Sequence, residues 1–136
     1  MSALDLLLMG SIFPGHTSGF SVRVMPEPRL LYVLRHRPGP AIAAGESVFD
    51  HPGIADHLEF LGRRATDGSL IAAGPLEEGS GEGMTVIAAA SLAEAERLAT
   101  TDDQSVVAGV LAVEVRAWQV VMDPGLVTIR SAPEPD

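Results

Sequence analysis

The chain of 136 residues contains no cysteine. This absence excludes thiolate catalysis, disulfide bonds and zinc sites built on cysteine. Basic side chains are also scarce, because 9 Lys and Arg residues stand against 18 Asp and Glu residues, which gives a formal net charge of -9. Binding to phosphates requires clustered basic side chains, so we expect no nucleic-acid partner.

The sequence also lacks a start typical of a signal peptide or a membrane span. The apolar stretch at residues 3–9 contains Asp5, follows no basic residue and is too short to cross a bilayer. We therefore predict a cytoplasmic protein with no membrane association. The length and the hydrophobic content of 46% predict a single hydrophobic core.

Turn signals and composition divide the chain into three parts. Residues 1–28 are predicted to form an N-terminal extension, with a turn at 14–19 and a short strand at 20–24, closed by Pro26-Glu27-Pro28. Residues 29–123 are predicted to form the compact domain. Residues 124–136 form a tail that ends in a Pro-rich segment without a folding signal.

Hydrophobic periodicity predicts six elements in the compact domain. They are a strand at 29–37, a helix from Pro52 to Asp67, strands at 69–73 and 84–90, a helix from the Ser91/Glu94 capping box to about Thr100, and a strand at 106–122. The order strand, helix, strand, strand, helix, strand predicts an α+β ferredoxin-like fold with an antiparallel sheet. Because both helices of such a fold cover one face of the sheet, we expect a homodimer that packs sheet to sheet.

His57 is the most promising chemical group, because it lies inside a predicted helix. On a helical wheel Ile54, Leu58, Leu61 and Ala65 form an apolar face, and His57 lies roughly 60–70° from its centre. A histidine pKa near neutrality suits a general base. The structural alternative is a boundary histidine that is hydrogen-bonded to backbone or water.

Several short motifs, taken in order and with their spacing, resemble the YCII-related (YciI-like) domain family of the dimeric α+β barrel group. The matching pieces are Arg37-Pro38-Gly39-Pro40, Asp56-His57-Leu58-Glu59-Phe60-Leu61, Gly68-Ser69-Leu70-Ile71-Ala72-Ala73-Gly74-Pro75, Ser91-Leu92-Ala93-Glu94-Ala95, Asp102-Asp103, Gly109-Val110-Leu111 and Glu114-Val115-Arg116-Ala117-Trp118. The resemblance covers residues 29–122 and leaves the N-terminal extension unmatched.

The resemblance implies a site in which the helix-borne histidine meets an aspartate that follows the second helix. Carried over by position, these residues are His57 and Asp103. The family usually has Asp-Pro at that point, whereas this chain has Asp103-Gln104, which leaves Asp102 as a competing candidate. The activities implied by the group include hydrolytic or eliminative dehalogenation of unsaturated ring-cleavage products, and muconolactone-type isomerisation and cofactor-free oxygenation occur in neighbouring families.

Other polar residues are candidates for the same cleft. Arg35 or Arg37, at the end of the first strand, could bind a substrate carboxylate, although a solvated strand end is the commoner role for such residues. Tyr32 is expected in the core or in the pocket wall.

The remaining histidines carry weaker expectations. His36 and His51 flank the loop between the first strand and the first helix and could line the cleft, although solvated loop positions are the more ordinary interpretation. His16 has no identifiable partner. No pair of histidines has the spacing of a metal-binding motif, so we expect no metal and no cofactor.

These observations predict a small cofactor-independent enzyme that moves a proton on an unsaturated or cyclic carbonyl compound. His57 would transfer the proton, Asp103 would orient it, and the reaction would be an isomerisation, elimination or cyclisation. Two alternatives remain open. One is a non-catalytic dimeric ligand-binding or accessory protein, and the other is a cofactor-free oxygenase of an aromatic substrate.

Overall fold

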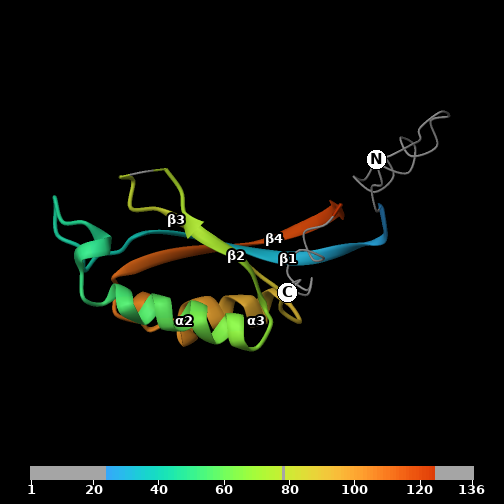
Figure 1. Cartoon of the computed structure of the whole chain (residues 1–136). Helices are drawn as coiled ribbons and strands as arrows, with labels where there is room; N and C mark the ends of the chain where they lie inside the picture. Colours follow the sequence, from blue (N-terminus) through green and yellow to red (C-terminus); the bar gives the residue numbers. More distant parts are fainter. Residues whose placement is uncertain (1–23, 78, 125–136) are drawn as a thin grey trace, which may run out of the picture. The chain divides into compact units, whose positions relative to one another are not determined.

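The computed structural model describes residues 24–77 and 79–124 (Figure 1). Within this range the chain falls into two compact units. The larger unit is Leu31–Trp118, and the described residues 24–30 and 119–124 belong to the other. None of the helices in the described ranges is long and apolar enough to cross a membrane. The predicted turn at 14–19 and the tail after residue 124 lie outside the described residues.

A four-stranded antiparallel sheet forms the framework, with the strand order β2-β3-β1-β4. The strands are β1 (Val24–Pro38), β2 (Leu70–Pro75), β3 (Gly83–Ile87) and β4 (Leu111–Met122). The central strand β3 pairs with β1, with Leu34 opposite Thr85, and with β2, with Ala73 opposite Thr85. The predicted α+β class with an antiparallel sheet is therefore confirmed, and the order of elements is compatible with a ferredoxin-like fold.

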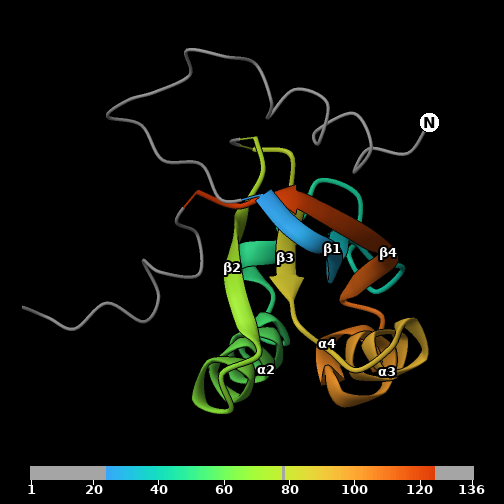
Figure 2. The same cartoon turned by 90° about the vertical axis from the view of Figure 1, so that its right-hand side faces the viewer.

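The helical segments lie between the strands in the chain. They are η1 (Val48–Asp50), α2 (Ile54–Thr66), α3 (Leu92–Arg97), the π-helical turn η2 (Leu98–Asp102) and α4 (Gln104–Val107). In the larger unit α2 and α3 lie on the same side of the sheet, as two views show (Figures 1 and 2). The main core cluster lies between them and the sheet, and it includes Tyr32, Leu34, Phe60, Ile87, Ala95, Leu98 and Ala99.

The capping box that begins α3 is present. The Ser91 hydroxyl accepts a hydrogen bond from the backbone N–H of Glu94 at 3.1 Å, and the Glu94 carboxylate accepts one from the N–H of Ala90 at 2.8 Å. The first bond satisfies a backbone donor that the first turn of the helix leaves free, and the second holds the N–H of Ala90, the residue before the N-cap. The sequence pattern therefore predicted the start of this helix correctly.

The predicted apolar face of α2 is right only in part, because Leu61 packs against the core and Ile54 is half-buried, but the other two members are exposed. Phe60 is the fully buried residue of this helix, whereas Leu58 is 61% exposed and Ala65 is exposed. The large Phe60 side chain fills the space between the helix and the sheet. The inward face of α2 therefore consists of His57, Phe60, Leu61 and Arg64, which have the i, i+3, i+4 and i+7 spacing of one helix face. His57 therefore lies on the inner face of the helix rather than on its shoulder.

Two predicted strand boundaries also differ from the structure. β1 begins at Val24, so Pro26-Glu27-Pro28 does not separate an extension from the strand. The last strand begins at Leu111 rather than Val106, because Gln104–Val107 forms the short helix α4. This helix ends in a turn at Gly109, whose φ of 78° lies in the left-handed region that favours glycine.

Gly39 connects the end of β1 to this turn. Its backbone N–H donates a hydrogen bond to the carbonyl of Val110 at 2.8 Å. A Cβ atom at position 39 would collide with the backbone oxygen of Gly109. The glycine in the motif Arg37-Pro38-Gly39-Pro40 is therefore required by the close approach of two backbone segments.

Candidate functional site

His57 and Asp103, which are 46 positions apart in the sequence, form a hydrogen bond between Nδ1 of the histidine and Oδ2 of the aspartate at 2.7 Å. Helix α2 carries His57 on its inner face, and Asp103 lies between η2 and α4. The Asp103 side chain is completely buried, and the His57 side chain is 13% exposed. The structure thus brings together the two residues that the family resemblance implied.

Asp103 is held in place by the start of α4. As the N-cap residue it accepts, on Oδ1, hydrogen bonds from the backbone N–H of Ser105 at 3.0 Å and from the Ser105 hydroxyl at 2.6 Å. The other oxygen accepts the bond from His57. The carboxylate therefore has three hydrogen bonds, a number that fixes its orientation toward the histidine.

Burial by itself would raise the pKa of Asp103. The hydrogen bonds from His57 and Ser105, together with the favourable charge interaction with His57, outweigh this and lower the pKa below the ordinary 3.8. Asp103 is consequently ionised at neutral pH. An ionised carboxylate on Nδ1 favours the tautomer in which that nitrogen carries the proton, which leaves Nε2 as a proton acceptor.

Asp102 faces different partners from its neighbour. Its carboxylate lies 3.3 Å from the guanidinium of Arg63 and 3.6 Å from that of Arg64. Both arginines come from the last turns of α2. The adjacent aspartates therefore have different roles. Asp103 contacts the histidine, whereas Asp102 forms ion pairs that link η2 to α2.

His36 lies beside His57, on strand β1. The two ring centroids are 4.6 Å apart, with an interplanar angle of 64°. His36 is only 4% exposed, so the expectation of a solvated loop histidine is wrong. Its side chain points inward because Tyr32, Leu34 and His36 alternate along one face of the strand.

The environment of His36 keeps its imidazole neutral. Desolvation by burial and the neighbouring His57 lower the pKa from 6.5 to about 4, although Asp103 acts in the opposite direction. Among the described residues neither ring nitrogen of His36 has a hydrogen-bond partner. A buried polar group without a partner is unusual in a protein interior.

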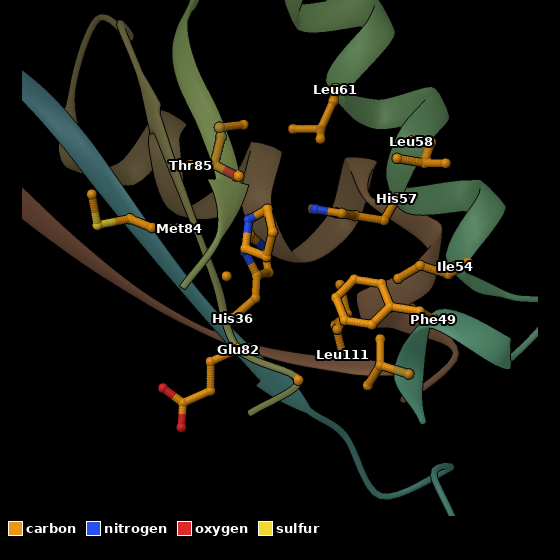
Figure 3. A pocket seen from close by; sticks show the side chains of 16 residues that line it. His36, Phe49, Ile54, His57, Leu58, Leu61, Glu82, Met84, Thr85 and Leu111 are labelled. Carbon is orange, nitrogen blue, oxygen red and sulfur yellow. The ribbon is translucent and has the colours of Figure 1, made fainter. Parts of the chain in front are cut away.

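A cavity of about 390 Å³ opens beside the two histidines (Figure 3). His36 and His57 reach it from β1 and α2, and Thr85 and Glu82 are its other polar or charged lining residues. The bulkier apolar part of the wall consists of Val48, Phe49, Ile54, Leu58, Leu61, Pro75, Met84 and Leu111. This volume suits a small organic molecule, and the wall offers mainly apolar contacts.

The two arginines at the end of β1 are not part of the cavity wall. Arg35 has a side chain 54% exposed and lies 3.7 Å from the carboxylate of Glu82, and Arg37 is exposed. Both arginines therefore lie at the solvated end of the strand, as the commoner role for such residues has it. Tyr32 is buried in the core cluster and does not line the cavity either.

His51 has a local role. Its Nδ1 accepts a hydrogen bond from the backbone N–H of Gly53 at 2.9 Å, just before α2 begins. It does not line the cavity. His16 lies outside the described residues.

His36, His57 and Asp103 are also possible metal ligands. One ligand atom from each lies within 4.8 Å of the others. However, Nδ1 of His57 and both oxygens of Asp103 already take part in hydrogen bonds. Oδ2 of Asp103 nevertheless accepts only one of these bonds and keeps a lone pair, so the three residues together still offer as many ligands as a typical catalytic zinc site. The expected absence of a metal stays a prediction.

Two features of the site were missed at the sequence level, although each has a detectable signal. Ser105 lies two residues after Asp103, a spacing typical of an aspartate N-cap and its first helical turn. The inward direction of the His36 side chain follows from the alternation of side chains between the two faces of β1, because this strand extends to Pro38 and includes His36.

Comparison of the chain with protein-family models, with curated protein sequences and with solved structures finds no significant match. The relation to the YCII-related family therefore stays a prediction carried by the sequence motifs. The class that the fold defines is a small α+β protein with one antiparallel sheet. The site adds a buried histidine–aspartate pair at an apolar cavity.

Proposed function

We propose that this protein is a cofactor-independent enzyme that transfers a proton within a small carbonyl compound, by isomerisation, elimination or cyclisation. The observation that carries the proposal is the 2.7 Å hydrogen bond between His57 and the buried Asp103, at the edge of a cavity that His57 lines. This arrangement is the one expected of a general base and the carboxylate that orients it.

The chemistry follows from the protonation states. Asp103 accepts a hydrogen bond from the Nδ1–H of His57, so Nε2 of the same ring is available to remove a proton from a carbon next to a carbonyl group. The imidazolium formed in this step is stabilised by the ionised Asp103, which is shielded from water. Return of the proton to a second carbon completes an isomerisation without any cofactor.

We also propose membership of the YCII-related group and a ferredoxin-like topology that dimerises sheet to sheet. In the larger unit α2 and α3 leave the opposite face of the sheet without a helix (Figures 1 and 2). We expect light scattering to give a mass near twice the 14.2 kDa of the chain. A mass near that of a single chain over a wide concentration range would contradict the dimer.

The proton-transfer function is tested by hydrogen exchange in deuterium oxide. We expect the protein to accelerate the loss of the proton signals next to the carbonyl group, followed by NMR, in cyclohexanone, cyclohexenone or an unsaturated five-membered lactone. His57→Gln should slow this exchange by about 100-fold or more, because general-base catalysis contributes that much.

His51→Gln is the matched control, because His51 does not line the cavity and its exchange rate should remain close to that of the unaltered protein. Exchange no faster than in buffer with every compound would contradict the proposal. Equal rates for His57→Gln and the unaltered protein would do the same. Saturable binding of a compound without exchange would instead favour the ligand-binding alternative.

A further inference from the structure

The cavity contains an unusual combination of polar groups. Glu82 is its only charged lining residue among the described residues, apart from the titratable histidines, and no arginine or lysine lines it. Arg63 and Arg64 are paired with Asp102, and Arg35 faces Glu82. Among the described residues a substrate carboxylate in this cavity would therefore find no arginine or lysine on the wall, and the carboxylate of Glu82 points away from the two histidines (Figure 3).

His36 and Thr85 are the uncharged polar groups of the wall besides His57, and His36 is the one whose buried polar atoms have no partner among the described residues. It lines the cavity and is only 4% exposed. Neither ring nitrogen has a hydrogen-bond partner among the described residues. A neutral imidazole has one N–H donor and one acceptor nitrogen. Leaving both unpaired in an apolar environment is unfavourable, and a ligand oxygen that accepts the N–H would relieve part of this penalty.

We propose that His36 donates a hydrogen bond to the carbonyl oxygen of an uncharged, largely apolar substrate, while His57 removes the proton from the adjacent carbon. This inference rests on the proposed function and adds the oxygen-binding group and the class of substrate. Both rings line the same cavity and their centroids are 4.6 Å apart, a separation that one small molecule in the cavity can span (Figure 3).

The step balances without a further reactant. The C–H bond next to the carbonyl group breaks, its proton passes to Nε2 of His57, and its electron pair forms a carbon–carbon double bond. The carbonyl oxygen gains negative charge and is stabilised by the N–H of His36. The proton then returns from His57 to the same carbon or to a conjugated one, which yields exchange or an isomer.

A neutral histidine suits this role better than a charged one. Its pKa of about 4, lowered by burial and by His57, keeps the N–H donor in place at neutral pH without a positive charge beside the imidazolium that forms on His57. Asp103, paired with His57, is an acidic group beside the two rings, whereas the carboxylate of Glu82 points away from them (Figure 3) and is paired with Arg35. Two positive rings at this separation would oppose the proton transfer.

The test uses the full chain and ketone labelled with ¹³C at the carbonyl carbon. A hydrogen bond to the oxygen moves the carbonyl resonance downfield, and this readout does not require turnover. We expect a downfield shift for bound cyclohexanone in the unaltered protein and in His57→Gln, and its loss in His36→Leu. His36→Gln, which retains an N–H donor, should restore part of the shift.

Exchange rates provide the second measurement. We expect His36→Leu to slow proton exchange by about 100-fold, the effect of removing one donor from a developing oxyanion, and His36→Gln to recover part of the rate. Cyclohexanone should bind more tightly than its carboxylate-bearing analogue. If the analogue binds more tightly, the proposed substrate class is wrong.

The two proposals fail in different ways. A carbonyl shift that is absent in the unaltered protein, or unchanged in His36→Leu, overturns the role of His36 whatever the exchange rates are. A shift that depends on His36, together with exchange that does not depend on His57, supports the oxygen-binding role and overturns the general base. Stoichiometric binding of Co²⁺ with visible absorption bands that His36→Leu abolishes would also overturn the inference, because His36 would then be a metal ligand.

Discussion

Replacing Asp103 with alanine is expected to lower the free energy of unfolding by about 4 kcal/mol. The side chain is 0% exposed and accepts three hydrogen bonds, one from His57 and two from Ser105. Alanine would leave these donors without partners inside the protein and would remove the N-cap of α4. Urea unfolding at neutral pH measures the change.

Asp102→Ala is the matched control, because it removes a carboxylate from the adjacent position. Its side chain is 34% exposed, and its ion pairs with Arg63 and Arg64 are partly solvated. Such pairs contribute about 1 kcal/mol or less. Equal losses of stability for the two variants would mean that Asp103 has no special role in the buried site.

The second large effect is a loss of stability in mild acid that originates at His36. In the unfolded chain this histidine binds a proton once the pH falls below its ordinary pKa of 6.5. In the folded protein burial and His57 lower its pKa to about 4, so it binds a proton only near pH 4. Between these values the unfolded state binds more protons, so the free energy of unfolding falls as the pH falls. The full contribution is about 3 kcal/mol, since each pKa unit corresponds to about 1.4 kcal/mol.

Unfolding of the unaltered protein and of His36→Leu should be compared at pH 7.5 and pH 4.5. Leucine has no proton to bind, so we expect most of the difference between the two pH values to disappear in the variant. Asp103, whose pKa is lowered, stabilises the fold above its ordinary pKa and loses this contribution only as the pH falls further. An identical loss in both proteins would contradict the neutral state of His36.

The accuracy of the sequence-based predictions depended on how local each signal was. The capping box at Ser91 and a strand through Leu111–Met122 were predicted correctly, because neighbouring residues determine both. The inward face of α2 was predicted only in part, since Leu61 packs against the core but Leu58 is exposed. Leu58 and Phe60 are both apolar, and only the space above the sheet decides which of them is buried.

The candidate site likewise combines features that the sequence predicted with features that only the packing determines. The resemblance to the YCII-related family singled out His57 and Asp103, but it left Asp102 as a competitor. The choice between the two aspartates depends on the π-helical turn η2 and on Ser105, which direct one carboxylate toward His57 and leave the other facing Arg63 and Arg64. Arg35 was expected to hold an anion, yet its position at the strand end pairs it with Glu82 instead.

By itself, the sequence determined the absence of thiol chemistry, the acidic charge, the α+β class and the position of one histidine on a helix. These properties follow from composition and from periodicities of two and 3.6 residues, which need no distant contacts. Only the tertiary structure decided that His36 is buried, that it meets His57, and that no arginine of the described residues lines the cavity beside them. Each of these depends on residues far apart in the chain, whose separation is set by how the helices pack on the sheet.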